Sequence, residues 1–248
     1  MGGHLEVEHV SINYESRCAV ADVSFELRPG EKFIVLGPSG CGKSTLLKAV
    51  AGFLRPSNGH IRLDGQLVTR PGPDRVVVFQ EFDQLLPWRT VVGNVAYPLQ
   101  VACRLGRGEA AERAAGFVEM VGLAGFGAAY PHTLSGGMKQ RVALARALAL
   151  NPSVLLMDEP FASLDALTRT RMQTELNAIW ERTRTTILFV THSIEEAVLL
   201  GSRILVMTPG PGRVQAVLDN TAYGEPIESP HFGAFQAQIG GLLHGQGS

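Results

Sequence analysis

The chain has 248 residues, enough for one large domain that buries its own hydrophobic core. Hydrophobic residues make up 45% and charged residues 18% of it, a globular composition that excludes intrinsic disorder. The formal net charge of −1 shows no basic excess, so we expect no nucleic-acid partner.

Other features of the sequence indicate a cytosolic protein. No uninterrupted apolar run approaches the roughly 18 residues of a membrane span. The N-terminus lacks the cationic and apolar regions of a signal peptide. The 3 cysteines follow neither a disulfide pattern nor a metal-ligand pattern. We therefore expect any contact with a membrane to come through a partner.

The first part of the chain alternates between apolar and polar residues, as strands with one buried face do. The alternation covers residues 5–14, with one change of face, and residues 23–27 and 61–63. Pro29 and Gly30 mark a turn after the second run. We predict an antiparallel sheet with one solvent-exposed face.

A second set of strands is predicted from apolar runs that do not alternate, as in strands buried on both faces. Helical stretches at residues 44–52, 138–150 and 168–182 separate several of these runs, which favours a parallel sheet flanked by helices. The runs are residues 33–36, 76–79, 154–157, 186–191 and 204–207.

The chain is predicted to form one α/β domain over residues 1–220. A helical subdomain is inserted at about residues 82–150, where no convincing strand occurs before His132. Residues 221–248 form a C-terminal tail with the three- and four-residue spacing of a short amphipathic helix. The apolar residues of that helix are Phe232, Phe235, Ile239 and Leu242.

A phosphate-binding loop is predicted at residues 37–45, GPSGCGKST, between an apolar strand and a helix. Glycines let backbone N–H groups converge on phosphates, and the helix directs its positive end at the same anion. Lys43 can reach the β- and γ-phosphates, and the Ser44 hydroxyl can bind Mg²⁺. The alternative is a glycine-rich turn before a helix. The predicted nucleotide-binding residues of the loop are Gly37, Pro38, Ser39, Gly40, Cys41, Gly42, Lys43, Ser44 and Thr45.

Cys41 within this loop has two interpretations. The favoured one is that it occupies a variable position of the motif. In the other, the helix end and Lys43 lower the pKa of the thiol, and bound ATP protects it from alkylation.

A predicted strand at residues 154–157 runs directly into two carboxylates. Ligands gather at the carboxyl ends of parallel strands, so Asp158 is placed to hold Mg²⁺. Glu159 is the candidate general base for the attacking water. The alternative is an N-capping aspartate followed by a solvated glutamate.

Residues 134–141 read LSGGMKQR. With this motif, the phosphate loop and the acidic strand end, the chain resembles the ATP-binding subunit of ABC transporters over roughly residues 4–215. The resemblance implies a P-loop NTPase fold: α/β with a mixed core sheet, an N-terminal antiparallel β subdomain and a helical insert. It also implies ATP hydrolysis, with Mg²⁺ as cofactor.

The resemblance implies roles for further residues. Tyr14 matches the aromatic residue that stacks on adenine. Gln80 matches the glutamine that contacts Mg²⁺ and the attacking water, and His192 matches the histidine that contacts the γ-phosphate. Asp165 belongs to the loop that crosses to a partner subunit.

The signature residues Ser135, Gly136 and Gly137 stand at a helix start, which is a natural anion site. In the family, two subunits pair head to tail, and each signature closes on ATP held by the other. We expect such a dimer with a second, identical subunit. The alternative is an N-capped helix with a flexible lead.

Two classes of function fit such a chain: the motor subunit of a membrane transporter, and a soluble, non-transport ABC-type ATPase. The second class usually carries long coiled coils or two cassettes in one chain. Neither feature occurs here, so compactness favours transport.

The segments LLPWRTVVGNV and EPFASLDALTR resemble the bacterial nitrate/sulfonate/taurine importer branch. We expect Leu85, Leu86 and Trp88 to form a contact surface for an integral membrane permease, unless they fold back into the insert's own core. A periplasmic substrate-binding protein is the indirect partner. The expected location is peripheral, at the cytoplasmic face of the inner membrane.

Overall fold

The computed structural model describes residues 3–15, 17–80 and 84–244, and the chain divides into two compact units. The first unit comprises Met1–Gly72 and Arg184–Ser248, and the second comprises Pro73–Thr183. The strands of the first unit are β1 (Leu5–Tyr14), β2 (Arg17–Leu27), β3 (Lys32–Leu36), β4 (Asn58–Leu63), β5 (Gln66–Leu67), β8 (Thr186–Thr191), β9 (Arg203–Met207) and β10 (Val214–Asp219). Its helices are α1 (Lys43–Val50), α6 (Ile194–Leu200) and α7 (Pro230–His244).

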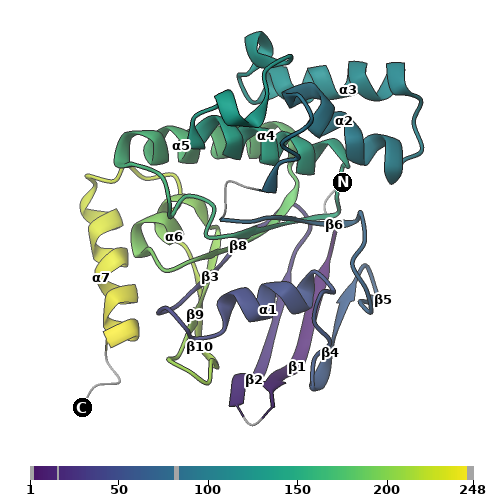
Figure 1. Ribbon diagram of the computed structural model, residues 1–248. Helices are drawn as coiled ribbons and strands as arrows, with labels where there is room; N and C mark the ends of the chain where they lie inside the picture. Colours follow the sequence, from purple (N-terminus) through teal and green to yellow (C-terminus); the bar gives the residue numbers. More distant parts are fainter. Residues whose placement is uncertain (1–2, 16, 81–83, 245–248) are drawn as a thin grey trace. The chain divides into compact units, whose positions relative to one another are not determined.

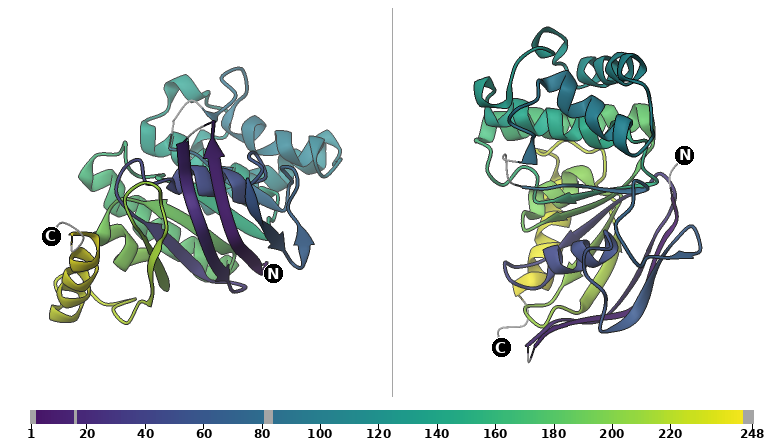
Figure 2. Two further views of the ribbon diagram at one scale, coloured as in Figure 1. Left: turned by 90° about the horizontal axis from the view of Figure 1, so that it is seen from below. Right: turned by 45° about the vertical axis from the view of Figure 1, so that its right-hand side comes forward.

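The predicted N-terminal antiparallel sheet is present in the order β2-β1-β4-β5. Figure 2 shows β1 and β2 running side by side. The predicted change of face in β1 falls at a register shift between Val7 and Val10, which are both buried. His9 has a φ of 48° there, because a β-bulge needs one residue outside the regular strand conformation.

The second sheet of the first unit is mixed. β9, β3 and β8 are parallel neighbours, and β10 pairs antiparallel with β9. All residues of β3 and β8 are buried, as their unbroken apolar sequences predict. β10 was not predicted, because most of its side chains are only half-buried and its sequence lacks a clear alternation.

The helices of the first unit pack on its sheets. α1 follows β3 and contacts β8, β1 and β2. α7 lies beside α6 (Figure 1) and buries Phe232, Phe235 and Ile239, which belong to the predicted amphipathic pattern. α6 was not predicted, because its 7 residues are too few to show a clear helical period.

The second unit contains a parallel strand pair and a helical layer. α2, α3 and α4 pack against one another (Figure 2), and the described residues from 84 to 133 contain no strand, as predicted. The predicted start of the helical subdomain, at about residue 82, lies outside the described residues. The elements are β6 (Arg75–Val78), α2 (Val91–Val101), α3 (Arg107–Met120), the 3₁₀ turns Ala124–Phe126 and Pro131–Thr133, α4 (Gly136–Ala149), β7 (Val154–Asp158) and α5 (Ala166–Thr183).

α2 was not predicted, because Gly93 and Pro98 obscure its helical pattern. The structure accommodates both residues, since Pro98 lies in the last part of the helix and Thr90 caps its N-terminus. Across the described ranges, no helix is long and apolar enough to cross a bilayer.

Candidate active site

The predicted phosphate loop connects β3 to α1 in the first unit. α1 begins at Lys43, and its N-cap is Gly42, which has no side chain that could accept from the backbone N–H groups of the first turn. Its first turn contains no acidic residue. An α-helix leaves its first four N–H groups without intrahelical partners, so this end of α1 is suited to an anion.

Glycine at position 42 is required by close packing. Gly42 has a φ of 102°, and a Cβ there would lie 2.6 Å from the Ala19 carbonyl oxygen and 2.8 Å from Val20 Cγ2, both on β2. Gly40 also has a positive φ, 78°, but a Cβ there would meet nothing within 4 Å. The loop is therefore fitted against β2 at Gly42 and open at Gly40.

Lys43 is buried in the loop. Its ammonium group donates to the carbonyl oxygens of Gly37 at 2.8 Å and Pro38 at 3.0 Å. These contacts hold the charge against the same backbone that would surround a phosphate. Ser44 and Thr45 follow on the first turn of α1 and are half-buried.

Cys41 is fully buried, which favours the interpretation that it only fills a position of the motif. A Cβ on Gly37 would lie 2.8 Å from its Sγ, and a Cβ on Gly212 would overlap its carbonyl oxygen. The thiol has no exposed surface for an alkylating reagent, so the structure does not support a reactive Cys41.

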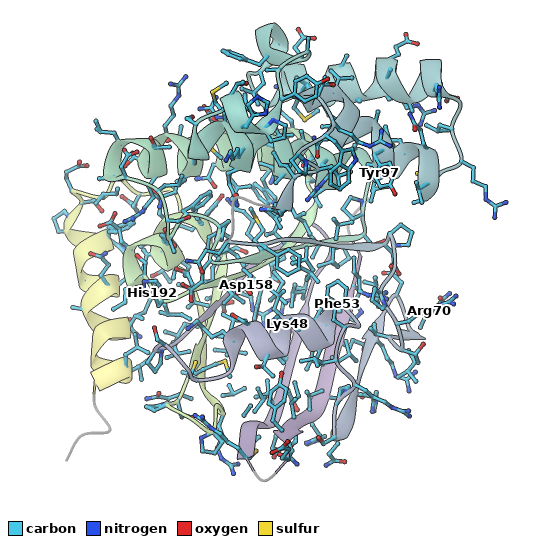
Figure 3. All side chains as sticks on the ribbon, viewed as in Figure 1. Lys48, Phe53, Arg70, Tyr97, Asp158 and His192 are labelled. Atoms are coloured by element: carbon cyan, nitrogen blue, oxygen red, sulfur yellow. The ribbon has the colours of Figure 1, made fainter. Side chains whose placement is uncertain are left out.

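His192 leaves the sheet at the same edge as the phosphate loop. In the parallel β3–β8 pair, Leu36 lies opposite Thr191, so Gly37 and His192 each follow the carboxyl end of neighbouring strands. The His192 side chain is exposed, and Figure 3 shows it in the connection that leads into α6.

Tyr14 ends β1 and is 47% exposed. On the β1–β2 ladder it lies two positions beyond Ile12, whose partner is Val20. Val20 is the residue whose side chain packs over Gly42. Tyr14 itself pairs with Arg17, close along β2 to the segment that contacts the phosphate loop.

Gln80, Asp158 and Glu159 follow a strand pair in the second unit. β6 and β7 are parallel, with Val78 opposite Met157, so these residues leave the pair at one edge. Asp158, labelled in Figure 3, and Glu159 are half-buried, and Gln80 is exposed.

Glu159 has an unusual backbone conformation. Its φ of 45° lies in the left-handed region, and its carbonyl oxygen accepts from the Ala162 N–H at 3.2 Å. A non-glycine residue in this conformation costs about 1 kcal/mol or more. The turn after β7 therefore fixes the direction in which the Glu159 carboxylate leaves the strand.

Two glutamines that the sequence analysis missed hold the end of β6. The Gln84 side chain accepts from the Phe79 N–H at 3.3 Å and donates to the Phe79 carbonyl at 2.9 Å. Buried Gln140, on α4, donates to the same carbonyl at 3.3 Å. Phe79 directly precedes Gln80, so this network fixes the backbone from which Gln80 extends.

The signature residues lie at the start of α4. Exposed Ser135 is the N-cap, and its hydroxyl accepts from the Met138 N–H at 3.3 Å. A Cβ on Gly137 would lie 2.7 Å from Thr168 Cγ2, so the contact with α5 requires glycine there. Gly136 lies between them as the first residue of α4. The N-cap that the alternative interpretation requires is thus present, and the role of these residues toward a partner's nucleotide stays a prediction.

Asp165 caps α5. Its carboxylate accepts from the Thr168 N–H at 3.0 Å, and this hydrogen bond lowers the pKa of the exposed carboxyl group. A lowered pKa means that the ionised form stabilises the fold above the ordinary aspartate pKa. That contribution is lost as the pH falls through the pKa of the folded state.

The candidate magnesium ligands supply oxygen atoms of three kinds: the Ser44 hydroxyl, the Gln80 amide and the Asp158 carboxylate. Mg²⁺ prefers such ligands and often takes only one or two carboxylates beside substrate phosphates. No group of three or more His, Cys, Asp or Glu side chains in the described part of the chain could hold a metal. One carboxylate beside neutral oxygen ligands suits a Mg²⁺ ion that binds together with the phosphates of a nucleotide.

Comparison with known proteins identifies the family. Residues 20–162 match the family described as ABC transporter. The chain is 49% identical to the taurine import ATP-binding protein TauB of Rhizobium johnstonii, over 97% of this chain and 96% of that protein. The chain belongs to the ABC transporter family. A TauB of Pseudomonas putida is 50% identical, over 85% of this ABC transporter chain and 80% of that protein.

A solved structure confirms the predicted ABC ATPase fold. The ATP-binding cassette MJ0796, as a dimer in a post-hydrolysis state bound to ADP and Pi, has a TM-score of 0.76 and 31% sequence identity. The match covers 87% of this chain and 98% of that chain.

Trp88 is presented by a loop of the second unit that Asn94 holds in place. The Trp88 side chain is 70% exposed, as predicted, and Leu86 is half-buried. Leu85 was predicted to be exposed, but it is buried in the unit's own core. Fully buried Asn94 accepts from the Leu86 N–H at 2.7 Å and donates at 3.1 Å to three loop carbonyls, those of Leu86, Arg89 and Thr90.

A second exposed aromatic residue of this ABC transporter subunit lies on α2. The Arg89 guanidinium lies over the Tyr97 ring, 4.5 Å from its centroid, and Tyr97, labelled in Figure 3, is partly exposed. Exposed aromatic side chains on and beside a loop that buried hydrogen bonds fix are typical of a contact site.

The two loop glycines make a matched pair of variants. Gly40→Ala should cost about 1–2 kcal/mol of backbone strain, without a clash inside the chain. Gly42→Ala carries the same strain and must also displace β2, which adds about 1–3 kcal/mol. Thermal unfolding and ATP affinity of both purified variants measure the difference. Equal losses in both variants would show that packing against β2 does not shape the loop.

Proposed function

We propose that this chain is the ATP-hydrolysing motor subunit of a bacterial ABC importer, and that its cargo is taurine or a similar small solute such as another sulfonate or nitrate. The observation that carries the proposal is the identity with taurine import ATP-binding proteins along nearly the whole chain. The phosphate loop and the residues after β7 and β8 supply the chemistry that such a motor needs.

The first unit binds the nucleotide in this proposal. The N–H groups of residues 37–45 and the buried Lys43 ammonium surround the phosphates. Tyr14 stacks on adenine, a role that its exposed side chain at the end of β1 supports. His192 contacts the γ-phosphate from the end of the neighbouring strand.

Hydrolysis depends on the oxygen-bearing side chains. Ser44, Gln80 and Asp158 hold Mg²⁺, which when bound neutralises charge that develops on the phosphates. Gln80 also orients the attacking water, and the glutamine network around Phe79 supports its position. Glu159 accepts the water's proton, and the rigid turn after β7 restricts its orientation.

A second copy of the chain completes the catalytic unit. We expect the copies to pair head to tail, so that Ser135, Gly136, Gly137 and Asp165 of each face the nucleotide of the other. The exposed helix start at Ser135 supports this arrangement. ATP that binds the closed pair more tightly than the open pair supplies the work of closing.

The pair acts on an integral membrane permease, which receives the motion and takes cargo from a periplasmic binding protein. Exposed Trp88 and the Arg89–Tyr97 pair form the surface for this permease. The expected location is therefore peripheral, at the cytoplasmic face of the inner membrane.

Glu159→Gln tests the catalytic assignment. The amide cannot accept the water's proton, so kcat for ATP hydrolysis should fall by about 10²- to 10⁴-fold while ATP affinity stays close to that of the wild type. Steady-state phosphate release and equilibrium ATP binding give the two values. Glu181→Gln, an exposed change on α5, is the matched control and should be silent. Near-normal turnover of Glu159→Gln would remove Glu159 as the base.

Trp88 tests the transport assignment. Tagged Glu159→Gln protein with MgATP, used as bait in detergent-solubilised native membranes, should recover a multi-span permease. Adding Trp88→Ala should reduce recovery by tenfold or more, because exposed tryptophans at interfaces often contribute about 2 kcal/mol. Phe126→Ala, which removes another exposed aromatic side chain of the same unit, should not. Recovery of soluble proteins alone would favour a non-transport ABC-type ATPase.

A further inference from the structure

Two buried residues that are hydrogen-bonded to each other, Thr191 and Glu196, flank His192 in the sequence. The Thr191 hydroxyl donates to the Glu196 carboxylate at 2.6 Å and accepts from the Ser193 N–H at 3.0 Å. Thr191 is 1% exposed and Glu196 is 6% exposed. His192, which lies between them in the sequence, has an exposed side chain. Two buried, hydrogen-bonded side chains therefore flank an exposed one in the sequence.

The geometry is a modified capping box. Ser193 caps α6, and its hydroxyl accepts from the Glu196 N–H at 3.3 Å. In an ordinary capping box, the glutamate side chain returns directly to the N-cap N–H. Here the Thr191 hydroxyl stands between the Glu196 carboxylate and that N–H. The inserted hydroxyl ties the last residue of β8 to the first turn of α6.

The bond from the Ser193 N–H back to the Thr191 hydroxyl closes a small turn around His192. Thr191 is also fixed by the sheet, because it pairs with Leu36 of β3 as the last residue of β8. α6 packs on β3 and β8. The His192 backbone is thus held between a buried strand end and a capped helix.

A structural role alone accounts poorly for this arrangement. Burying a carboxylate is costly unless it is well hydrogen-bonded, and a β-branched apolar residue would suit a fully buried strand end at least as well. A direct bond from Glu196 to the Ser193 N–H would cap α6 without involving β8.

We infer that Thr191 and Glu196 are positioning residues, which hold His192 in the orientation that contacts the γ-phosphate during hydrolysis. The inference rests on the proposed function, because it takes His192 as the γ-phosphate contact. The two residues act through His192 and touch neither the nucleotide nor the water.

Thr191→Val and Thr191→Ser make the decisive comparison. Valine keeps the branched shape and removes the hydroxyl, so kcat should fall by about ten- to a hundredfold while ATP affinity stays within about twofold. Serine keeps the hydroxyl and should retain most of the turnover. Glu196→Gln keeps an acceptor for the hydroxyl and should lose less than Glu196→Ala.

A double-mutant cycle separates positioning from stability. In the His192→Ala background, Thr191→Val should cause no further loss of kcat, because no imidazole remains to be oriented. A further loss there, accompanied by a lower melting temperature, would mean that Thr191 only stabilises the fold. If Thr191→Val does not fold, Glu196→Ala takes its place in the same cycle.

The outcomes also distinguish this inference from the proposed function. Normal kcat in Thr191→Val, with a strong loss in His192→Ala, would overturn the inference and leave the role of His192 standing. Normal kcat in His192→Ala would overturn both.

Discussion

The parallel register of neighbouring strands is the constraint on which the candidate site depends. Because Leu36 lies opposite Thr191, the phosphate loop and His192 start from the same edge of one sheet. Because Val78 lies opposite Met157, Gln80 and the two carboxylates start from one edge of another pair. In both cases the functional residues come from chain segments far apart in sequence. A shift of one residue in the register of the β3–β8 or the β6–β7 pair would misplace them.

Buried polar side chains then fix the loops that leave these edges. Lys43 holds the carbonyls of its own loop, Gln140 holds the residue before Gln80, and Thr191 closes the turn around His192. Asn94 does the same for the loop that presents Trp88. A buried polar group must find partners, and here the partners are loop backbone atoms beside functional side chains. These hydrogen bonds therefore fix the geometry of the site as well as stabilising the fold.

The sequence was enough to predict the features that local chemistry dictates. Unbroken apolar runs marked β3 and β8, and the GPSGCGKST spacing marked the loop. The sequence did not predict Gln84 or Gly212, since each acts through a contact with a distant segment that no local pattern reveals. α6 was missed although its signal was present: Ser193 followed by Glu196 is the spacing of a capping box.

The proposed mechanism requires that two copies of the chain share two nucleotides, with each signature completing the other copy's site. Sedimentation velocity of the Glu159→Gln protein tests it most directly. We expect a monomer without nucleotide and a dimer with MgATP. A second change, Ser135→Arg, should abolish the dimer while each chain still binds ATP. A chain that binds ATP and stays monomeric, or a dimer that Ser135→Arg leaves unchanged, would rule out this head-to-tail pairing.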